Sequence, residues 1–163
     1  MSETARPATS DDLDPLARLA EDAVAEQAEA RGGPLWSRRE TRTPPYRVSL
    51  EQAFHDPDRE LWVGLYADAI VGYAVCGLEV LRTGELLGRV EDLYVMPDAR
   101  SVGVGEALMD LIVAWCEQRR CVGIDAHALP GNRATKNFFE TFGFKARLLT
   151  VHRPLRDFGE AGR

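Results

Sequence analysis

The sequence predicts an α/β protein in which about four helices flank a mixed, mostly antiparallel sheet of about six to seven strands. Three observations support this fold class. The chain has 163 residues with a hydrophobic content of 45%, enough for one core, so we expect a single domain over residues 1–163. Short apolar runs separated by tight turns indicate antiparallel strands. Longer runs with apolar residues three and four positions apart indicate amphipathic helices.

The first elements lie in an acidic segment. Glu3–Ala8 is expected to form a short strand, and Ser10 then caps a helix that ends near Arg31. The apolar positions of this helix are Leu13, Leu16, Leu19, Ala20 and Val24. The stretch Gly32–Pro45 is rich in glycine and proline, which predicts a mobile loop with one turn of helix around Trp36. A loop of this length is either a substrate-gating segment or a surface connector.

The middle of the chain predicts one short helix and three strands. The helix is expected over Ser49–His55. Strands Leu61–Ala67 and Ile70–Leu78 flank Asp68, which predicts a tight antiparallel hairpin, and the second strand is apolar enough to be buried on both faces. A further strand is expected over Leu86–Met96.

The last third of the chain alternates helices and strands. The helix Gly105–Arg120 is the best specified, because its acidic residue lies at the positive end and its arginines lie at the negative end. Cys121–Ala128 is expected to be a strand, and a helix over Asn132–Thr141 ends at Gly143. Phe144–His152 is predicted to be the last strand, followed by a polar tail.

The charge distribution argues against nucleic acid as a partner. The net charge of −6 comes entirely from the first thirty residues, which hold eight acidic side chains against Arg6 and Arg18. The remaining residues are balanced, whereas a duplex-binding protein needs a basic stripe. An acidic surface attracts cationic amines slightly better than a neutral surface does.

The N-terminal sequence lacks the features of an export signal. It has no basic region followed by an apolar run, and the chain has no apolar run of membrane-spanning length. We therefore expect a cytoplasmic protein with no membrane association. The three cysteines, Cys76, Cys116 and Cys121, lie in apolar patterns without metal-ligand spacing, which predicts buried reduced thiols and no metal site.

Residues Val90–Trp115 are typical of a phosphate-binding unit, with a strand, a turn, a glycine loop and a helix in that order. A Walker A loop is excluded, because Gly105 is followed by Glu106 and Ala107 instead of lysine and a hydroxyl residue. A dinucleotide-binding loop is excluded as well. Leu108 stands where its third glycine belongs, and the unit follows several antiparallel strands.

Two interpretations remain: a glycine-rich turn that caps the helix, or a loop whose backbone amides point at a pyrophosphate. Gly103 and Gly105 let the backbone approach the ligand, and Arg100 adds charge-assisted hydrogen bonds. The candidate anion-binding residues are Arg100, Ser101, Val102, Gly103, Val104, Gly105 and Glu106.

Two blocks of this sequence, Val90–Leu108 and Asn132–Phe144, resemble the GNAT superfamily of acyl-CoA-dependent N-acetyltransferases. The resemblance implies a sheet that splays between the strands Leu86–Met96 and Cys121–Ala128, with the pantetheine of acetyl-CoA entering there. The resemblance also implies that acetyl-CoA is the co-substrate and that its pyrophosphate binds to the loop that contains Arg100, Gly103 and Gly105. Further residues implied beside the cofactor are Leu93, Tyr94, Val95, Asn132, Phe138 and Phe139.

The sequence departs from the family pattern at two positions. Ser101 replaces a glycine, which a surface turn tolerates. Phe139 replaces the tyrosine that often protonates the departing thiolate, so the general acid is unassigned.

The strand Val90–Met96 resembles that of polyamine acetyltransferases, in which the glutamate matching Glu91 is the proposed base. Asp92 is the second candidate, and a third interpretation makes both carboxylates structural. Adjacent side chains point to opposite faces of a strand unless a bulge intervenes, so the sequence alone does not choose. His127, at a strand end, is more typical of packing than of catalysis.

We therefore expect an enzyme that transfers an acetyl group from acetyl-CoA to a primary amine by direct attack. The expected acceptor is a small cationic molecule such as a polyamine, an aminoglycoside or an amino-acid derivative. A protein lysine or N-terminus is the alternative acceptor, and a catalytically weak acyl-CoA-binding sensor is an alternative of another class, motivated by Phe139. The resemblance also points to a homodimer.

Overall fold

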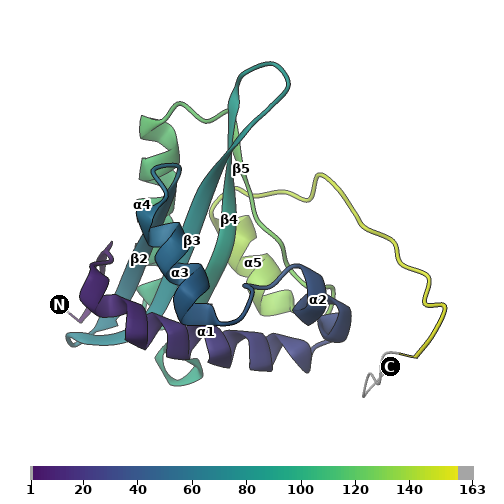
Figure 1. The fold of residues 1–163 in the computed structure, drawn as a ribbon, viewed down its shortest axis with the longest axis horizontal. Coiled ribbons are helices and arrows are strands. Elements are labelled where there is room, and N and C mark those ends of the chain that lie inside the picture. Colours follow the sequence, from purple (N-terminus) through teal and green to yellow (C-terminus); the bar gives the residue numbers. More distant parts are fainter. Residues whose placement is uncertain (1, 158–163) are drawn as a thin grey trace.

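The computed structural model describes residues 2–157, which form a five-stranded sheet with helices on both faces (Figure 1). The strands are β1 (Glu3–Pro7), β2 (Arg59–Tyr66), β3 (Ala69–Val80), β4 (Leu86–Val95) and β5 (Gly123–Asp125). The α-helices are α1 (Leu13–Ala28), α2 (Gly33–Arg39), α3 (Tyr46–His55), α4 (Val104–Gln118) and α5 (Arg133–Thr141). Short 3₁₀ turns, η1 (Ser10–Asp12) and η2 (Pro97–Ala99), precede α1 and follow β4. In residues 2–157 no helix combines the length and the apolar character needed to cross a membrane.

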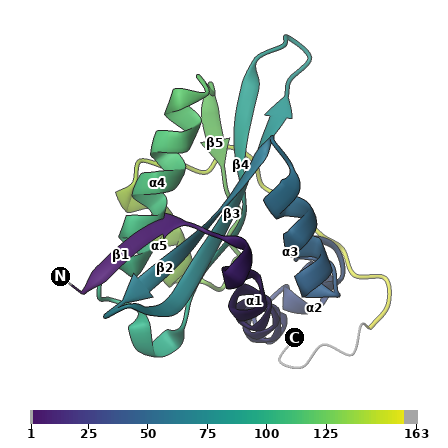
Figure 2. The same ribbon diagram turned by 60° about the vertical axis from the view of Figure 1, so that its left-hand side comes forward.

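The sheet is mixed and lies between two helical layers. Its strand order is β1-β2-β3-β4-β5, antiparallel throughout except for the parallel pair β4 and β5. Helices α1 and α3 cover one face, and α4 and α5 cover the other (Figure 2). Alternate residues of a strand enter the two cores: Tyr73 and Val75 face α1 and α3, whereas Ala74 and Cys76 face α4. The predicted α/β fold class is thus confirmed, although residues 2–157 contain five strands instead of the expected six to seven, and five α-helices instead of about four.

Two glycines let α4 lie close to the sheet. A Cβ atom at Gly64 of β2 would lie 2.5 Å from Val104 Cγ1, and one at Gly88 of β4 would lie 2.5 Å from Cys116 Sγ. Both ends of α4 therefore lie close to the sheet. The predicted hairpin at Asp68 is also present, with Ala67 and Asp68 at φ of 50° and 68° in its two-residue turn.

The predicted strand over Cys121–Ala128 is much shorter in the structure. Only Gly123, Ile124 and Asp125 pair with β4, and the chain then leaves the sheet. The apolar sequence pattern continues beyond residue 125. A strand also needs a partner strand, and the backbone moves away from β4 after residue 125.

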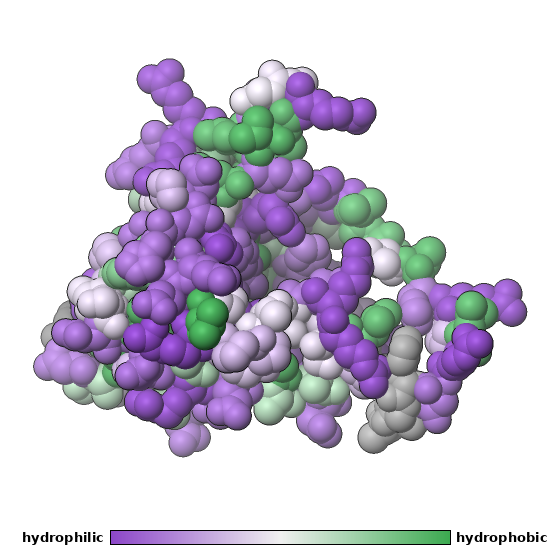
Figure 3. Space-filling view, viewed as in Figure 1, coloured by the Kyte–Doolittle hydropathy of each residue, from purple (hydrophilic) through white to green (hydrophobic). Residues whose placement is uncertain are grey.

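The predicted last strand over Phe144–His152 was wrong. Residues 144–157 are extended but pair with no strand among the described residues, and an ion pair of Arg147 with Asp125 joins this segment to β5. The segment runs away from the sheet, and apolar side chains follow it on the right of Figure 3. Because β5 ends at Asp125, its edge offers too few backbone groups to hold a partner strand.

The stretch Gly32–Pro45 is more ordered than predicted. It contains the helix α2, in which Trp36 donates from Nε1 to Gln27 Oε1 of α1 at 3.0 Å. The remainder of the stretch leads into α3, which begins at Tyr46, three residues before the predicted start.

Candidate functional site

Part of the outer edge of β4 is open. β4 pairs with β5 only at residues 87–89 but continues to Val95. On its other edge, the Met96 N–H donates to Val71 O at 2.8 Å. Backbone groups of successive residues alternate between the two edges of a strand, so those of Leu93 and Val95 face the open edge. The predicted splay between β4 and the strand after α4 is therefore present.

The loop from η2 to α4 aims backbone amides outward. The first hydrogen bond of α4 runs from Ala107 N–H to Gly103 O at 3.0 Å, so the amides of Val104, Gly105 and Glu106 precede the helical ladder. Gly103 is at φ 94°, a conformation that favours glycine. Ser101 is at φ 77°, where most residues are strained, which explains why glycine is usual there. These amides are the hydrogen-bond donors that the anion-binding interpretation requires.

Helix α5 packs directly against this terminus. A Cβ atom at Gly105 would lie 3.2 Å from Phe138 Cε1, so glycine allows the close contact between the two helices. Phe139 is buried in the core, with its ring 5.2 Å from that of Phe144. Asn132 caps α5, its Oδ1 accepting from Thr135 N–H at 3.1 Å. Phe138 thus lies at the predicted loop, whereas the polar group of Asn132 is engaged within its own helix.

Arg100 bridges the loop and helix α1. Its Nε donates to Val95 O at 2.8 Å, and its Nη2 donates to both carboxylate oxygens of Glu26 at 2.9 and 3.0 Å. The guanidinium also lies 5.5 Å from the centre of the Tyr94 ring. Arg100 therefore stands at the open edge of β4, where its charge is shared with an exposed acidic partner.

The candidate bases Glu91 and Asp92 lie at an irregularity of the sheet. The β3–β4 register shifts between Val75 and Cys76, which face Asp92 and Val90, so Glu91 is the extra residue of a bulge. The bulge overrides the usual alternation, and both carboxylates contact the same guanidinium on the side of α3.

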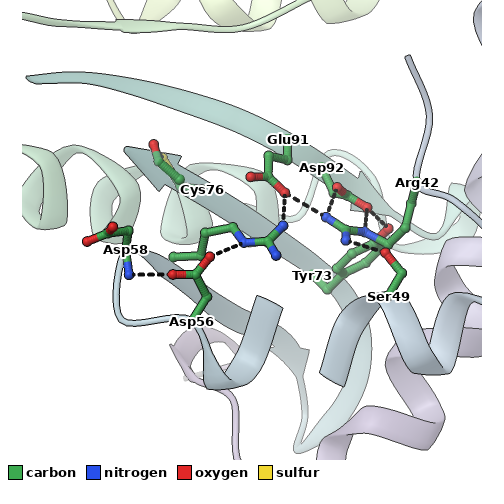
Figure 4. Close-up of polar contacts among 10 residues, drawn as sticks. Arg42, Ser49, Asp56, Asp58, Tyr73, Cys76, Glu91 and Asp92 are labelled. Atoms are coloured by element: carbon green, nitrogen blue, oxygen red, sulfur yellow. Dashed lines mark hydrogen bonds and ion pairs between the residues drawn. The ribbon is translucent and has the colours of Figure 1, made fainter. Parts of the chain in front are cut away.

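That guanidinium belongs to Arg42, which lies between α2 and α3. Its Nε and Nη2 donate to the two oxygens of Asp92 at 2.9 and 2.7 Å, and Nη2 also donates to Glu91 Oε1 at 2.9 Å. Nη1 donates to Ser49 Oγ at 2.9 Å, and the Tyr73 hydroxyl donates to Asp92 Oδ2 at 2.6 Å. Figure 4 shows Arg42 enclosed by these partners.

Proton affinities in this cluster follow from burial and charge. Burial opposes the charged form of Arg42, but the hydrogen bonds and negative charge of Asp92 outweigh it and hold the pKa of Arg42 above the usual arginine value. Burial, reinforced by the charge of Asp92, raises the pKa of Tyr73 well above its usual value. Tyr73 is therefore a neutral donor and Arg42 is a permanent cation.

Glu91 has a second cationic neighbour. Arg59 of β2 donates from Nη1 to Glu91 Oε1 at 3.2 Å. Glu91 Oε2 lies over Gly77 of β3, where a Cβ atom would come within 2.7 Å of it. A side chain at residue 77 would therefore displace the Glu91 carboxylate from its present position.

Arg42 was not predicted as a site residue, and no local sequence pattern identifies it. It is one of several arginines in a loop rich in glycine and proline, and its two carboxylate partners lie about fifty residues away. His127 is exposed and contacts the Trp36 ring edge-on at 5.9 Å. Cys76 and Cys116 are buried as predicted, with their sulfur atoms 3.8 Å apart, whereas Cys121 is only partly buried.

Solved structures of similar fold include several acetyltransferases. A Bacillus halodurans protein, solved as a tetramutant, superposes with a TM-score of 0.78 at 21% identity, covering 93% of this chain and 99% of the other. An aminoglycoside acetyltransferase from an uncultured soil metagenomic sample gives a TM-score of 0.69 at 14% identity, with 94% and 97% covered. A ribosomal-protein-alanine N-acetyltransferase from Brucella melitensis gives a TM-score of 0.69 at 17% identity, covering 95% of this chain and 100% of the other. At these identities the likeness establishes the fold.

Comparison at the level of sequence identifies the family. No protein of curated function matches the chain. The model of the acetyltransferase (GNAT) family matches residues 20–144, a span that includes α2, the acidic pair on β4, the glycine loop and α5. The open edge of β4 beside the amide-bearing terminus of α4 is the geometry that the resemblance implied, and we conclude that the chain belongs to the GNAT family of acetyltransferases.

Proposed function

We propose that this acyltransferase transfers an acetyl group from acetyl-CoA to a primary amine of a small cationic molecule by direct attack. One observation carries the proposal: the open edge of β4 runs into the outward-facing amides of α4. This continuous polar edge suits a ligand with an extended amide-containing arm and a pyrophosphate.

Acetyl-CoA fits the residues at this edge, and it supplies the acetyl group as a thioester. The backbone groups of Leu93 and Val95 would pair with the pantetheine amides, and the amides of residues 102–106 would hold the pyrophosphate. Arg100 would exchange Glu26 for the pyrophosphate. Breaking the Arg100–Glu26 pair costs little free energy, because both side chains are more than 40% exposed and such pairs contribute about 1 kcal/mol or less to stability.

The acceptor amine must lose a proton to become a nucleophile. With a pKa of about 10.4, an aliphatic amine is deprotonated at neutral pH at a cost of about 5 kcal/mol. We assign the base role to Glu91, because Asp92 is occupied by Arg42 and Tyr73. Phe139 supplies no acid, and none is required, since a thiolate whose conjugate acid has a pKa near 8.5 can be protonated by water.

The acceptor class follows from the acidic surface beside the site. Glu26 of α1 faces Arg100 and Tyr94 at the open edge, in the acidic N-terminal segment. A small cationic amine such as a polyamine, an aminoglycoside or an amino-acid derivative is favoured by this charge. The solved aminoglycoside and ribosomal-protein acetyltransferases of similar fold justify testing aminoglycosides and peptide N-termini together.

The test is thiol release from acetyl-CoA, followed with a thiol-reactive dye, with and without each amine. The panel comprises a polyamine, an aminoglycoside, an amino-acid amide and a peptide with a free N-terminus. We expect amine-dependent release for a small cationic amine and its acetylated form by mass spectrometry. Tight CoA binding without amine-dependent release for any amine would contradict the proposal and favour an acyl-CoA sensor.

We also propose a cytoplasmic homodimer. Leu148, Leu149, Val151 and Leu155 are each more than three-quarters exposed on the extended C-terminal segment. An apolar run of this kind is normally covered in solution, and a second copy offers the unpaired edge of β5 as a partner.

A further inference from the structure

Arg42 connects the segment between α2 and α3 to strand β4, and it contacts both candidate bases. Its side chain is 5% exposed, and it makes four hydrogen bonds, to Asp92 twice, to Glu91 and to Ser49. A buried guanidinium with this many partners is a fixed part of the structure, since releasing it would leave charges buried without partners. The segment before α3 is therefore anchored to the strand that carries the bases.

The two carboxylates are engaged unequally by this guanidinium. Asp92 accepts two hydrogen bonds from Arg42 and one from Tyr73, and its side chain is only 10% exposed. The Glu91 side chain is 26% exposed and accepts from Arg42 and Arg59 through Oε1 alone. Within residues 2–157, Glu91 Oε2 receives no hydrogen bond, so it is the carboxylate oxygen left for a ligand.

The charge of Arg42 also affects an amine that approaches Glu91. Two uncompensated carboxylates would favour the protonated amine and make the nucleophile harder to form. Arg42 and Arg59 offset much of the charge of Glu91 and Asp92, although Arg59 is shared with Asp56. The acceptor nitrogen then meets a proton-accepting oxygen with a weaker preference for the ammonium form than two unpaired carboxylates would impose.

We propose that Arg42 is a positioning residue for acetyl transfer, which occupies Asp92, holds Glu91 by Oε1 and leaves Glu91 Oε2 to take the proton of the acceptor amine. The inference rests on the proposed function of this site. In the step, the ammonium form of the acceptor first gives one proton to Glu91 Oε2, which passes it to solvent. The amine nitrogen then bonds to the acetyl carbon, the carbon–sulfur bond breaks and CoA leaves as a thiolate. The second proton that the nitrogen loses reaches the thiolate through water.

A double-mutant cycle between Arg42 and Glu91 tests this role. We expect Arg42→Gln to lower kcat by about tenfold or more, with the KM for acetyl-CoA within about twofold, because the CoA edge of β4 is untouched. Glu91→Gln should lower kcat comparably. In the double variant the second substitution should add little, because Arg42 acts through Glu91. Arg42→Lys, which keeps the charge, should recover part of the loss and also guards against misfolding of the glutamine variant.

Arg47→Gln is the matched control, since Arg47 lies on α3, pairs with Asp14 and is 42% exposed. It should leave kcat unchanged. Two results would overturn the positioning role without contradicting acetyl transfer. One is a double variant whose loss of kcat is the product of the two single losses. The other is an unchanged kcat in a folded Arg42→Gln protein. An unmodified protein without amine-dependent turnover would overturn the proposed function and the positioning role together.

Discussion

Glu91 and Asp92 are adjacent in sequence, yet their surroundings differ in ways that set different roles. Asp92 is nearly buried and accepts three hydrogen bonds, two of them from a cation. Glu91 shares its Oε1 between two arginines and keeps greater exposure. A buried, fully engaged carboxylate stabilises the fold, whereas a partly exposed one with an available oxygen can accept a proton.

The first prediction compares the two amide substitutions. Asp92→Asn should lower the free energy of unfolding by about 3 kcal/mol or more, because Arg42 is left buried without its counter-ion. Glu91→Gln should cost about 1 kcal/mol or less, as expected for a partly exposed pair. Urea unfolding followed by circular dichroism measures both. Equal losses would show that the two carboxylates are engaged equally in solution.

A second residue-scale prediction concerns the strained Ser101. At φ 77° a residue with a Cβ atom costs about 1–2 kcal/mol, whereas glycine adopts this conformation freely. Ser101→Gly should therefore raise the free energy of unfolding by up to about 1 kcal/mol after the entropy lost by glycine. Ser101→Ala, which retains the Cβ atom, should give no gain in the same unfolding experiment. A gain for alanine as large as that for glycine would rule out backbone strain as the cause.

At the scale of elements, the joint between β1 and α1 depends on one buried carboxylate. Asp12 is 5% exposed and accepts from Arg6 Nη1 at 2.8 Å and from Thr9 N–H at 2.7 Å. The hydrogen bond from Arg6 is the largest cause that holds the pKa of Asp12 below its usual value. The capping aspartate thus couples the first strand to the first helix.

This coupling makes stability depend on pH with a definite sign. Because the pKa of Asp12 is lower in the folded protein, its contribution is complete above about pH 4 and is lost as the pH falls below that value. We expect Asp12→Asn to destabilise the protein at pH 7 and to make its stability less dependent on pH between about 4 and 2. Thermal melts across this range measure the effect. Parallel curves for the two proteins would contradict it.

The whole molecule shows which parts of the structure local sequence determines. The helix α4 and the hairpin at Asp68 follow from periodicity and turn chemistry within a few residues, and these predictions were confirmed. The pyrophosphate site at the glycine loop stays a prediction. The Arg42 cluster could not be predicted, because it joins side chains about fifty residues apart through a bulge. The last strand was predicted from its apolar pattern. Strand pairing also needs a partner of sufficient length, and β5 is too short to provide one.

The exposed C-terminal segment gives a prediction at this scale. If a second copy covers it, replacing Leu148 and Leu149 with serine should convert a dimer into a monomer by light scattering. Far-ultraviolet circular dichroism should be unchanged, because neither side chain contributes to the core of its own chain. An unmodified protein that is monomeric at every concentration would contradict the dimer.

The central claim is that acetyl-CoA binds along the open edge of β4 and the N-terminus of α4. Amide hydrogen exchange, measured by NMR with and without CoA, tests this residue by residue. We predict that CoA slows exchange at Leu93, Val95 and residues 104–106 by about tenfold or more, because these amides face the ligand. Met96, whose N–H already donates to Val71 O, should exchange slowly in both states. Unchanged exchange at Leu93, Val95 and residues 104–106 in a protein saturated with CoA would contradict the account.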